Sequence, residues 1–281
     1  MNRPRTKIKK RRIPHSDAEQ LELSEHDFHA HAASEPMEAE DSPPQSWGTR
    51  AWNVLVGLSL FPFAWILTDA LFHTFGSAAQ LGVRVPFWMT HEFLMFAIGG
   101  GAWLAWFGVS IYIWNEPRPL RLYIWGHELT HMLVARLFGG RISDYKITRE
   151  GGYITTDRYN FLIALAPYLW PFYSVPVLAA WAVALWVSEP WVHRAWFLGL
   201  LGFTWMFHLS FTLWMLPKGQ TDFHGPGKLF SFTLIYLANV FLLGAALVVL
   251  TPEVSWHRTL HELWGAGLEF YEKVLRLIVG A

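Results

Sequence analysis

Three ionisable residues lie within five positions of an apolar stretch, in a His-Glu-x-x-His pattern formed by His127, Glu128 and His131. Side chains four residues apart share one face of an α-helix, so the two histidines can bind one metal ion. The intervening glutamate lies one step round the helix, where its carboxylate can polarise a water molecule at that metal. Composition alone predicts roughly 0.03 chance occurrences of this pattern per chain. The pattern therefore predicts a zinc-hydrolase site with Glu128 as general base.

A catalytic zinc site generally has a third protein ligand and one open position for water. The chain contains no Cys, so the third ligand must be another residue type. The best candidate is Asp222, in the Gly- and Pro-rich stretch 217–227 between two apolar segments; it could instead be a turn or helix-capping residue. Two rivals remain open: His208, which could instead bond a backbone group inside an apolar segment, and His224.

The composition of the chain favours a membrane protein. Hydrophobic residues make up 53% of the chain and charged residues 16%, well below the roughly 25% charged residues of a soluble domain. Six apolar segments each approach the roughly 20 residues that a spanning helix needs. They cover residues 54–75, 94–114, 120–138, 161–187, 195–216 and 229–250. The fold class predicted is an all-α polytopic membrane protein with about six transmembrane helices.

Composition divides the chain into three regions: a disordered charged N-terminal tail (1–48), a transmembrane domain that carries the predicted metal site (49–252) and an amphipathic C-terminal helix (253–281). The tail opens with a basic block, which favours a cytoplasmic N-terminus near anionic membrane lipid. The formal net charge of the whole chain is zero, so nothing indicates a nucleic-acid partner. The chain is expected to be an integral, multi-pass membrane protein.

Two short β-prone runs follow the motif segment, at residues 141–148 and 153–156, around the pair Gly151 and Gly152. This pattern predicts a small β-hairpin directly after the motif helix. At membrane depth a hairpin must be shielded by protein or lie at the interface. Its strand edge could hold a substrate extended, although a plain connecting loop is the alternative.

The chain resembles the site-2 protease family of intramembrane zinc metallopeptidases. The resemblance covers roughly residues 120–250 and rests on the run 126–131, the pair Gly139-Gly140, the predicted hairpin and the loop that carries Asp222. It implies that His127, His131 and Asp222 bind Zn²⁺ and that Glu128 is the general base. One departure is that Phe223 follows the aspartate, where the family commonly has Gly. The chain is therefore identified as a divergent member.

The predicted function is hydrolysis of peptide bonds in membrane-associated protein or peptide substrates. The main alternative is a catalytically inactive membrane scaffold or regulatory homologue that keeps the motif. A metallopeptidase with a glutamate as third ligand would need Glu150, Glu189, Glu253 or Glu262, which all have loop or surface character. Strict alternation of six spans puts Asp222 on the opposite side from the start of the motif segment. One segment is therefore expected to be re-entrant or interfacial, and residues 76–114 are the region considered for it.

Overall fold

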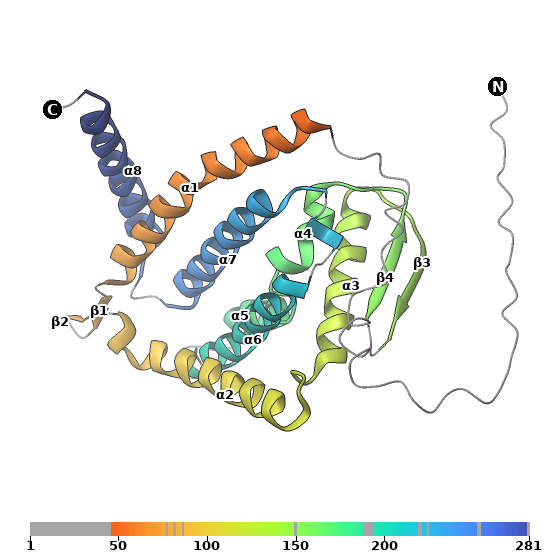
Figure 1. Cartoon of the computed structure of the whole chain (residues 1–281). Helices are drawn as coiled ribbons and strands as arrows, with labels where there is room; N and C mark the ends of the chain where they lie inside the picture. The colour runs from red at the N-terminus through yellow and green to blue at the C-terminus, as the bar shows by residue number, and fades with distance from the viewer. Residues whose placement is uncertain are drawn as a thin grey trace, which may run out of the picture. The chain divides into compact units, whose positions relative to one another are not determined.

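The computed structural model describes residues 46–76, 78–80, 83–85, 87–148, 151–187, 194–218, 221–223, 225–251 and 254–279. Nearly all of the predicted charged tail lies outside this part of the chain, as does His224. The described residues are mostly helical (Figure 1). The helices are α1 (Trp47–Gly76), α2 (His91–Trp114), α3 (Leu120–Leu137), α4 (Phe161–Leu169), α5 (Ser174–Val187), α6 (Arg194–Met215), α7 (Lys228–Leu250) and α8 (Trp256–Val279).

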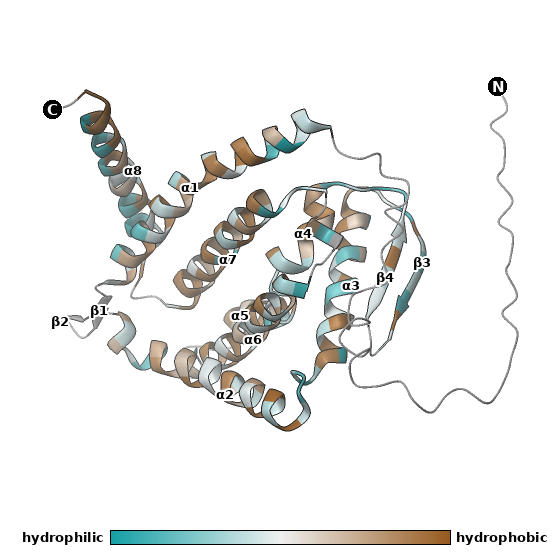
Figure 2. Cartoon of the chain, in the orientation of Figure 1, coloured by the Kyte–Doolittle hydropathy of each residue, from teal (hydrophilic) through white to brown (hydrophobic). Residues whose placement is uncertain are grey.

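Four helical stretches are long and apolar enough to cross a membrane: Trp47–Gly76, His91–Trp114, Arg194–Lys218 and Lys228–Leu250. A fifth is added if α4 and α5, which are bent by 71° at their break, count as one span. This number of apolar helices indicates a membrane protein, but the predicted six spans are not confirmed. The motif segment forms α3, whose 18 residues include His, Glu and Arg side chains that lower its hydropathy (Figure 2).

The predicted hairpin after α3 is confirmed. Strands β3 (Ile142–Ile147) and β4 (Gly152–Thr156) pair antiparallel, with Tyr145 opposite Ile154 and a bulge near the start of β3. Helix α3 ends where Gly139 adopts a φ of 73°, a backbone conformation that glycine accepts without strain. The chain then turns back, so that the hairpin lies along α3 (Figure 1).

A second two-stranded sheet was not predicted. Strands β1 (Ala78–Gln80) and β2 (Val83–Val85) pair antiparallel, and a 3₁₀ turn, η2 (Phe87–Met89), leads into α2. Thr90 caps α2 by accepting a hydrogen bond from the backbone N–H of Phe93. Helix α2 is continuous over 24 residues, so the bend among the described residues lies between α4 and α5 rather than in the region 76–114.

Local sequence signals set both ends of α4. Asn160 caps α4, because its side-chain oxygen accepts a hydrogen bond from the N–H of Ile163 at 2.8 Å. The helix ends before Pro171, which disfavours helical backbone at the preceding residue and cannot itself donate a hydrogen bond. Helix α4 is therefore a separate nine-residue unit, and it contacts α3 on one side and α7 on another.

Helices α2 and α6 form the most extensive helix pair. Gly99 and Gly199 face each other with no room for a side chain between them, which lets the two backbones approach closely. An ion pair between Glu92 and Arg194 joins the first turns of the two helices, and both side chains are largely buried. This pairing fixes the position of α6, whose end leads into the loop that carries Asp222.

Helix α8 is amphipathic, as the spacing of its apolar residues predicts (Figure 2). It contacts α1, and the guanidinium of Arg258 donates a hydrogen bond to the carbonyl of His73 at 3.2 Å. None of its side chains is buried, and its apolar residues, such as Trp264 and Leu268, remain exposed.

Candidate metal centre

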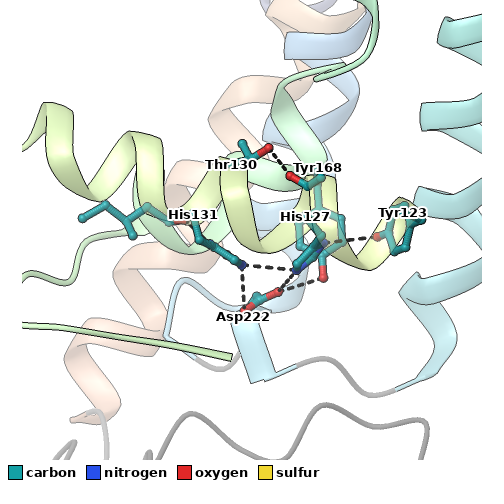
Figure 3. Close-up of polar contacts among 8 residues, drawn as sticks. Tyr123, His127, Thr130, His131, Tyr168 and Asp222 are labelled. Atoms are coloured by element: carbon teal, nitrogen blue, oxygen red, sulfur yellow. Dashed lines mark hydrogen bonds and ion pairs between the residues drawn. The ribbon is translucent and has the colours of Figure 1, made fainter. Parts of the chain in front are cut away.

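The structure brings Asp222 next to two histidines that precede it by more than ninety residues in the sequence. His127 and His131 lie on α3, and Asp222 lies on a 3₁₀ turn, η5 (Thr221–Phe223), between α6 and α7. One ligand atom from each residue lies within 4.8 Å of the other two (Figure 3). His127 is half-buried, whereas His131 and Asp222 are buried. This His-His-Asp group could hold a metal ion.

The distances between these ligand atoms suit a small four-coordinate ion. The two histidine Nε2 atoms are 3.2 Å apart. Asp222 Oδ2 lies 3.5 Å from His127 Nε2, and Asp222 Oδ1 lies 3.8 Å from His131 Nε2. Two ligands on a tetrahedral ion with bonds near 2.0 Å are separated by about 3.3 Å. The donor set therefore fits such an ion with little rearrangement.

The remaining ring nitrogens of both histidines have their own partners. His131 Nδ1 donates a hydrogen bond to the carbonyl of Ile163, at 2.8 Å across to α4. His127 Nδ1 lies 3.3 Å from the hydroxyl of Tyr123, one turn earlier on α3. A partner at Nδ1 fixes the ring orientation and leaves the Nε2 lone pair free for a metal. Both imidazoles are thus directed at the same point before any ion binds.

Asp222 is held from the side of α4. The hydroxyl of Tyr168 donates a hydrogen bond to Asp222 Oδ2 at 2.8 Å. Burial alone would raise the pKa of Asp222, but the adjacent histidines, His127 and His131, hold that pKa below its ordinary value. The N-cap residue of α7 is Gly227, so Asp222 does not occupy the capping position of that helix.

The neighbour Phe223 anchors the turn that presents Asp222. Its ring is buried and lies 4.9 Å, centroid to centroid, from the ring of Tyr168. Leu165 and Ile235 belong to the same apolar cluster. A large apolar side chain at position 223 therefore docks the loop onto α4 and α7.

Of the two rival histidines, His208 is not part of the group, and His224 lies outside the described residues. His208 is buried on α6 and its Nε2 lies 3.1 Å from the side-chain oxygen of Asn239. That asparagine in turn donates to the carbonyl of Tyr168 at 2.8 Å. His208 therefore belongs to a buried polar network that ties α6 and α7 to α4. Of the glutamates considered, Glu262 pairs with Arg258 on α8, and the other three lie outside the described residues.

Glu128 lies beside the metal group, next in the chain to His127, and its side chain is 6% exposed. The hairpin covers it. A Cβ atom built on Gly152 would lie 2.6 Å from Glu128 Cγ and 2.9 Å from its Oε1. The absence of a side chain at position 152 is therefore what allows β4 to approach the carboxylate this closely.

Sequence reasoning did not find four supporting features: the hydroxyls of Tyr123 and Tyr168, the Ile163 carbonyl and the contact of Gly152 with Glu128. Tyr123 could have been found, because it precedes His127 by four residues on the same helix. The others depend on how α4 and the hairpin dock against α3, for which the sequence carries no local signal.

Comparisons of the chain with protein-family models, with curated proteins and with solved structures found no match. The chemistry of the site is therefore argued from its residues and their geometry.

Proposed function

We propose that this chain is an intramembrane zinc metalloprotease, a divergent member of the site-2 protease family, that hydrolyses peptide bonds of membrane-associated substrates. The observation that carries the proposal is the convergence of His127, His131 and Asp222 beside the buried carboxylate of Glu128, in a chain with four or five apolar spans. Ionisable groups are costly to bury, so a cluster of four favours a functional site over a structural one.

Zinc is the metal that the donor set favours. Two imidazole nitrogens and one carboxylate oxygen leave a fourth position open, as in catalytic zinc sites. When bound, zinc would lower the pKa of a water molecule to about 7 and polarise the scissile carbonyl.

Glu128 supplies the proton transfers. Its carboxylate takes a proton from the attacking water, whose oxygen forms a bond to the carbonyl carbon of the substrate. The same carboxyl group then gives the proton to the leaving nitrogen as the C–N bond breaks. The products are a carboxylate and an amine, and the enzyme returns to its starting state. Burial under β4 excludes bulk water and holds the carboxylate in place.

The substrate must be extended for this chemistry, because peptide bonds inside a helix are shielded. Strand β3 pairs with β4 on one edge only among the described strands, so its other edge has backbone groups that can bond a substrate strand. The β3–β4 hairpin lies along α3 beside the metal group. We infer that the substrate is held along this edge.

The proposal is tested with the purified full-length chain, in detergent or in proteoliposomes, and a single-span membrane protein as substrate. Peptide products are expected to appear, to disappear on treatment with a zinc chelator and to return on addition of Zn²⁺. Mass spectrometry identifies the cut. Zinc bound without any cleavage across a panel of such substrates would contradict the enzyme and favour the scaffold alternative.

Gly152→Ala is expected to slow hydrolysis by roughly 10- to 100-fold while leaving zinc content unchanged. The added methyl would force the Glu128 side chain to move, and a displacement near 1 Å can cost about 100-fold in rate. The measurement is kcat on the same substrate together with metal analysis. Gly108→Ala on α2 is the matched control, because a Cβ there meets nothing within 4 Å. Full activity of the Gly152 variant would show that the hairpin does not position the base.

A further inference from the structure

A groove lies between the hairpin and the side of α3 that carries Glu128. Residues at intervals of four follow one side of a helix, so Glu128, Met132 and Arg136 line up along α3. The hairpin covers this side: Gly152 contacts Glu128, and the start of β3 lies near the other two residues.

The groove has a volume of about 320 Å³, enough for several side-chain atoms. Its walls come from α3 and from the exposed part of β3. The lining residues are Met132, Arg136, Ile142, Ser143, Asp144 and Tyr145. The groove is thus mixed in character, with an apolar side and two charged groups, and it opens onto the same β3 strand whose outer edge is available to a substrate.

The two charged groups of the groove, Asp144 and Arg136, differ in the hydrogen bonds and ion pairs that they already form. Asp144 accepts hydrogen bonds from the backbone N–H of Tyr145 at 2.8 Å and from the hydroxyl of Tyr153 at 3.1 Å. Arg136 is exposed and forms no ion pair with any carboxylate of the described residues. Its five N–H donors are therefore free for a planar anionic group.

The charged residues around Arg136 also favour an anionic ligand. Besides Arg136, the described residues of the α3 end and hairpin include three cations, Arg141, Lys146 and Arg158, and two acids, Asp144 and Asp157. Asp157 already accepts a hydrogen bond from the backbone N–H of Arg141 at 2.7 Å. The local field is positive, which favours an anionic ligand.

We propose that this groove binds an acidic side chain of an extended substrate segment, and that Arg136 is the residue that recognises it. The proposal rests on the proposed function, and it specifies the substrate. Arg136 lies eight residues beyond Glu128 on α3, about 12 Å along the helix axis. An extended strand advances about 3.3 Å per residue, so the acidic residue belongs roughly three to four positions from the scissile bond.

The test uses the full-length chain with Glu128→Gln, which prevents turnover, in detergent micelles. The probes are two fluorescent Thr- and Val-rich peptides that differ only in a central Glu or Gln, and binding is measured by anisotropy. The Glu peptide is expected to bind about fivefold more tightly, as one exposed but well-oriented ion pair would give. In the Glu128→Gln chain, the further change Arg136→Gln should give the Glu and Gln peptides equal affinities. The change Arg136→Glu should instead make the chain prefer a third peptide, which has Lys in place of the central Glu.

Arg121→Gln is the matched control, since Arg121 is an exposed cation on the same helix outside the groove. The proposal is overturned if both peptides bind equally, if the Arg136 variants keep the preference, or if Arg136→Gln weakens only binding to phosphatidylglycerol vesicles. Peptide binding needs no turnover, so failure of the proposed protease is a separate result. If the Glu128→Gln chain prefers the Glu peptide while the unaltered chain cleaves no substrate, the proposed protease activity is contradicted and the groove assignment stands.

Discussion

Glu128→Gln is expected to abolish peptide hydrolysis while the chain keeps its bound metal. Glutamine has the same shape as glutamate but cannot accept the proton of the attacking water, and general-base catalysis contributes roughly 10²- to 10⁴-fold. Metal binding should be unaffected, because the ligand atoms belong to His127, His131 and Asp222. The two measurements are product formation from a single-span substrate and metal content by mass spectrometry.

The control for this variant is Glu269→Gln, which changes an exposed glutamate on α8 that pairs with Lys273 in the next turn. Its activity should equal that of the unaltered chain. Cleavage retained by Glu128→Gln would remove Glu128 from the mechanism. Loss of both cleavage and metal would mean that Glu128 contributes to the metal site itself.

The second large effect is expected when a metal ligand is removed. His131→Ala or Asp222→Ala should reduce the metal content from about one zinc per chain to near background, because only two protein ligands would remain. Hydrolysis should fall with it. The measurement is metal content of protein purified in the same way, with circular dichroism to show that the helices are kept.

His73→Ala is the matched control for the ligand variants. His73 lies 3.8 Å from Asp69 on α1, so it is also a histidine beside a carboxylate, but it is exposed and outside the metal group. It should bind as much zinc as the unaltered chain. If Asp222→Ala retained full metal while His208→Ala lost it, the third ligand would be His208, and the arrangement described for Asp222 would be wrong.

The sequence carried enough information to identify the motif helix, the hairpin and the apolar helices. Each of these depends on local periodicity: four-residue spacing for His127 and His131, and β-prone runs around Gly151 and Gly152 for the hairpin. The number of spans was predicted less well, because the 18 residues of α3 include Arg121, Glu128 and Arg136, and α3 is not among the candidate spans. The bend between α4 and α5 also required the structure, although Pro171 marks its place.

The surroundings of the candidate metal centre could not be predicted, since they arise from contacts between distant segments. Tyr168 reaches Asp222 over 54 residues of sequence, and His131 reaches the Ile163 carbonyl over 32. Phe223 looked like a departure from a family pattern, and only its burial beside Tyr168 shows why a large side chain suits that position. Contacts between distant segments leave no periodic pattern within either segment.

The short helix α4 supplies a partner to both sides of the metal group, through the Ile163 carbonyl to α3 and through the Tyr168 hydroxyl to the α6–α7 loop. An ion bound there would cross-link segments that are synthesised well apart, closing a loop of roughly ninety residues. Affinity for the ion would thus depend on completed assembly, and the ion would in turn stabilise the assembled state. The motif helix α3 is synthesised before the other parts of the site and carries only two of the three ligands. The metal centre would therefore form last, after α4 and α7 are in place.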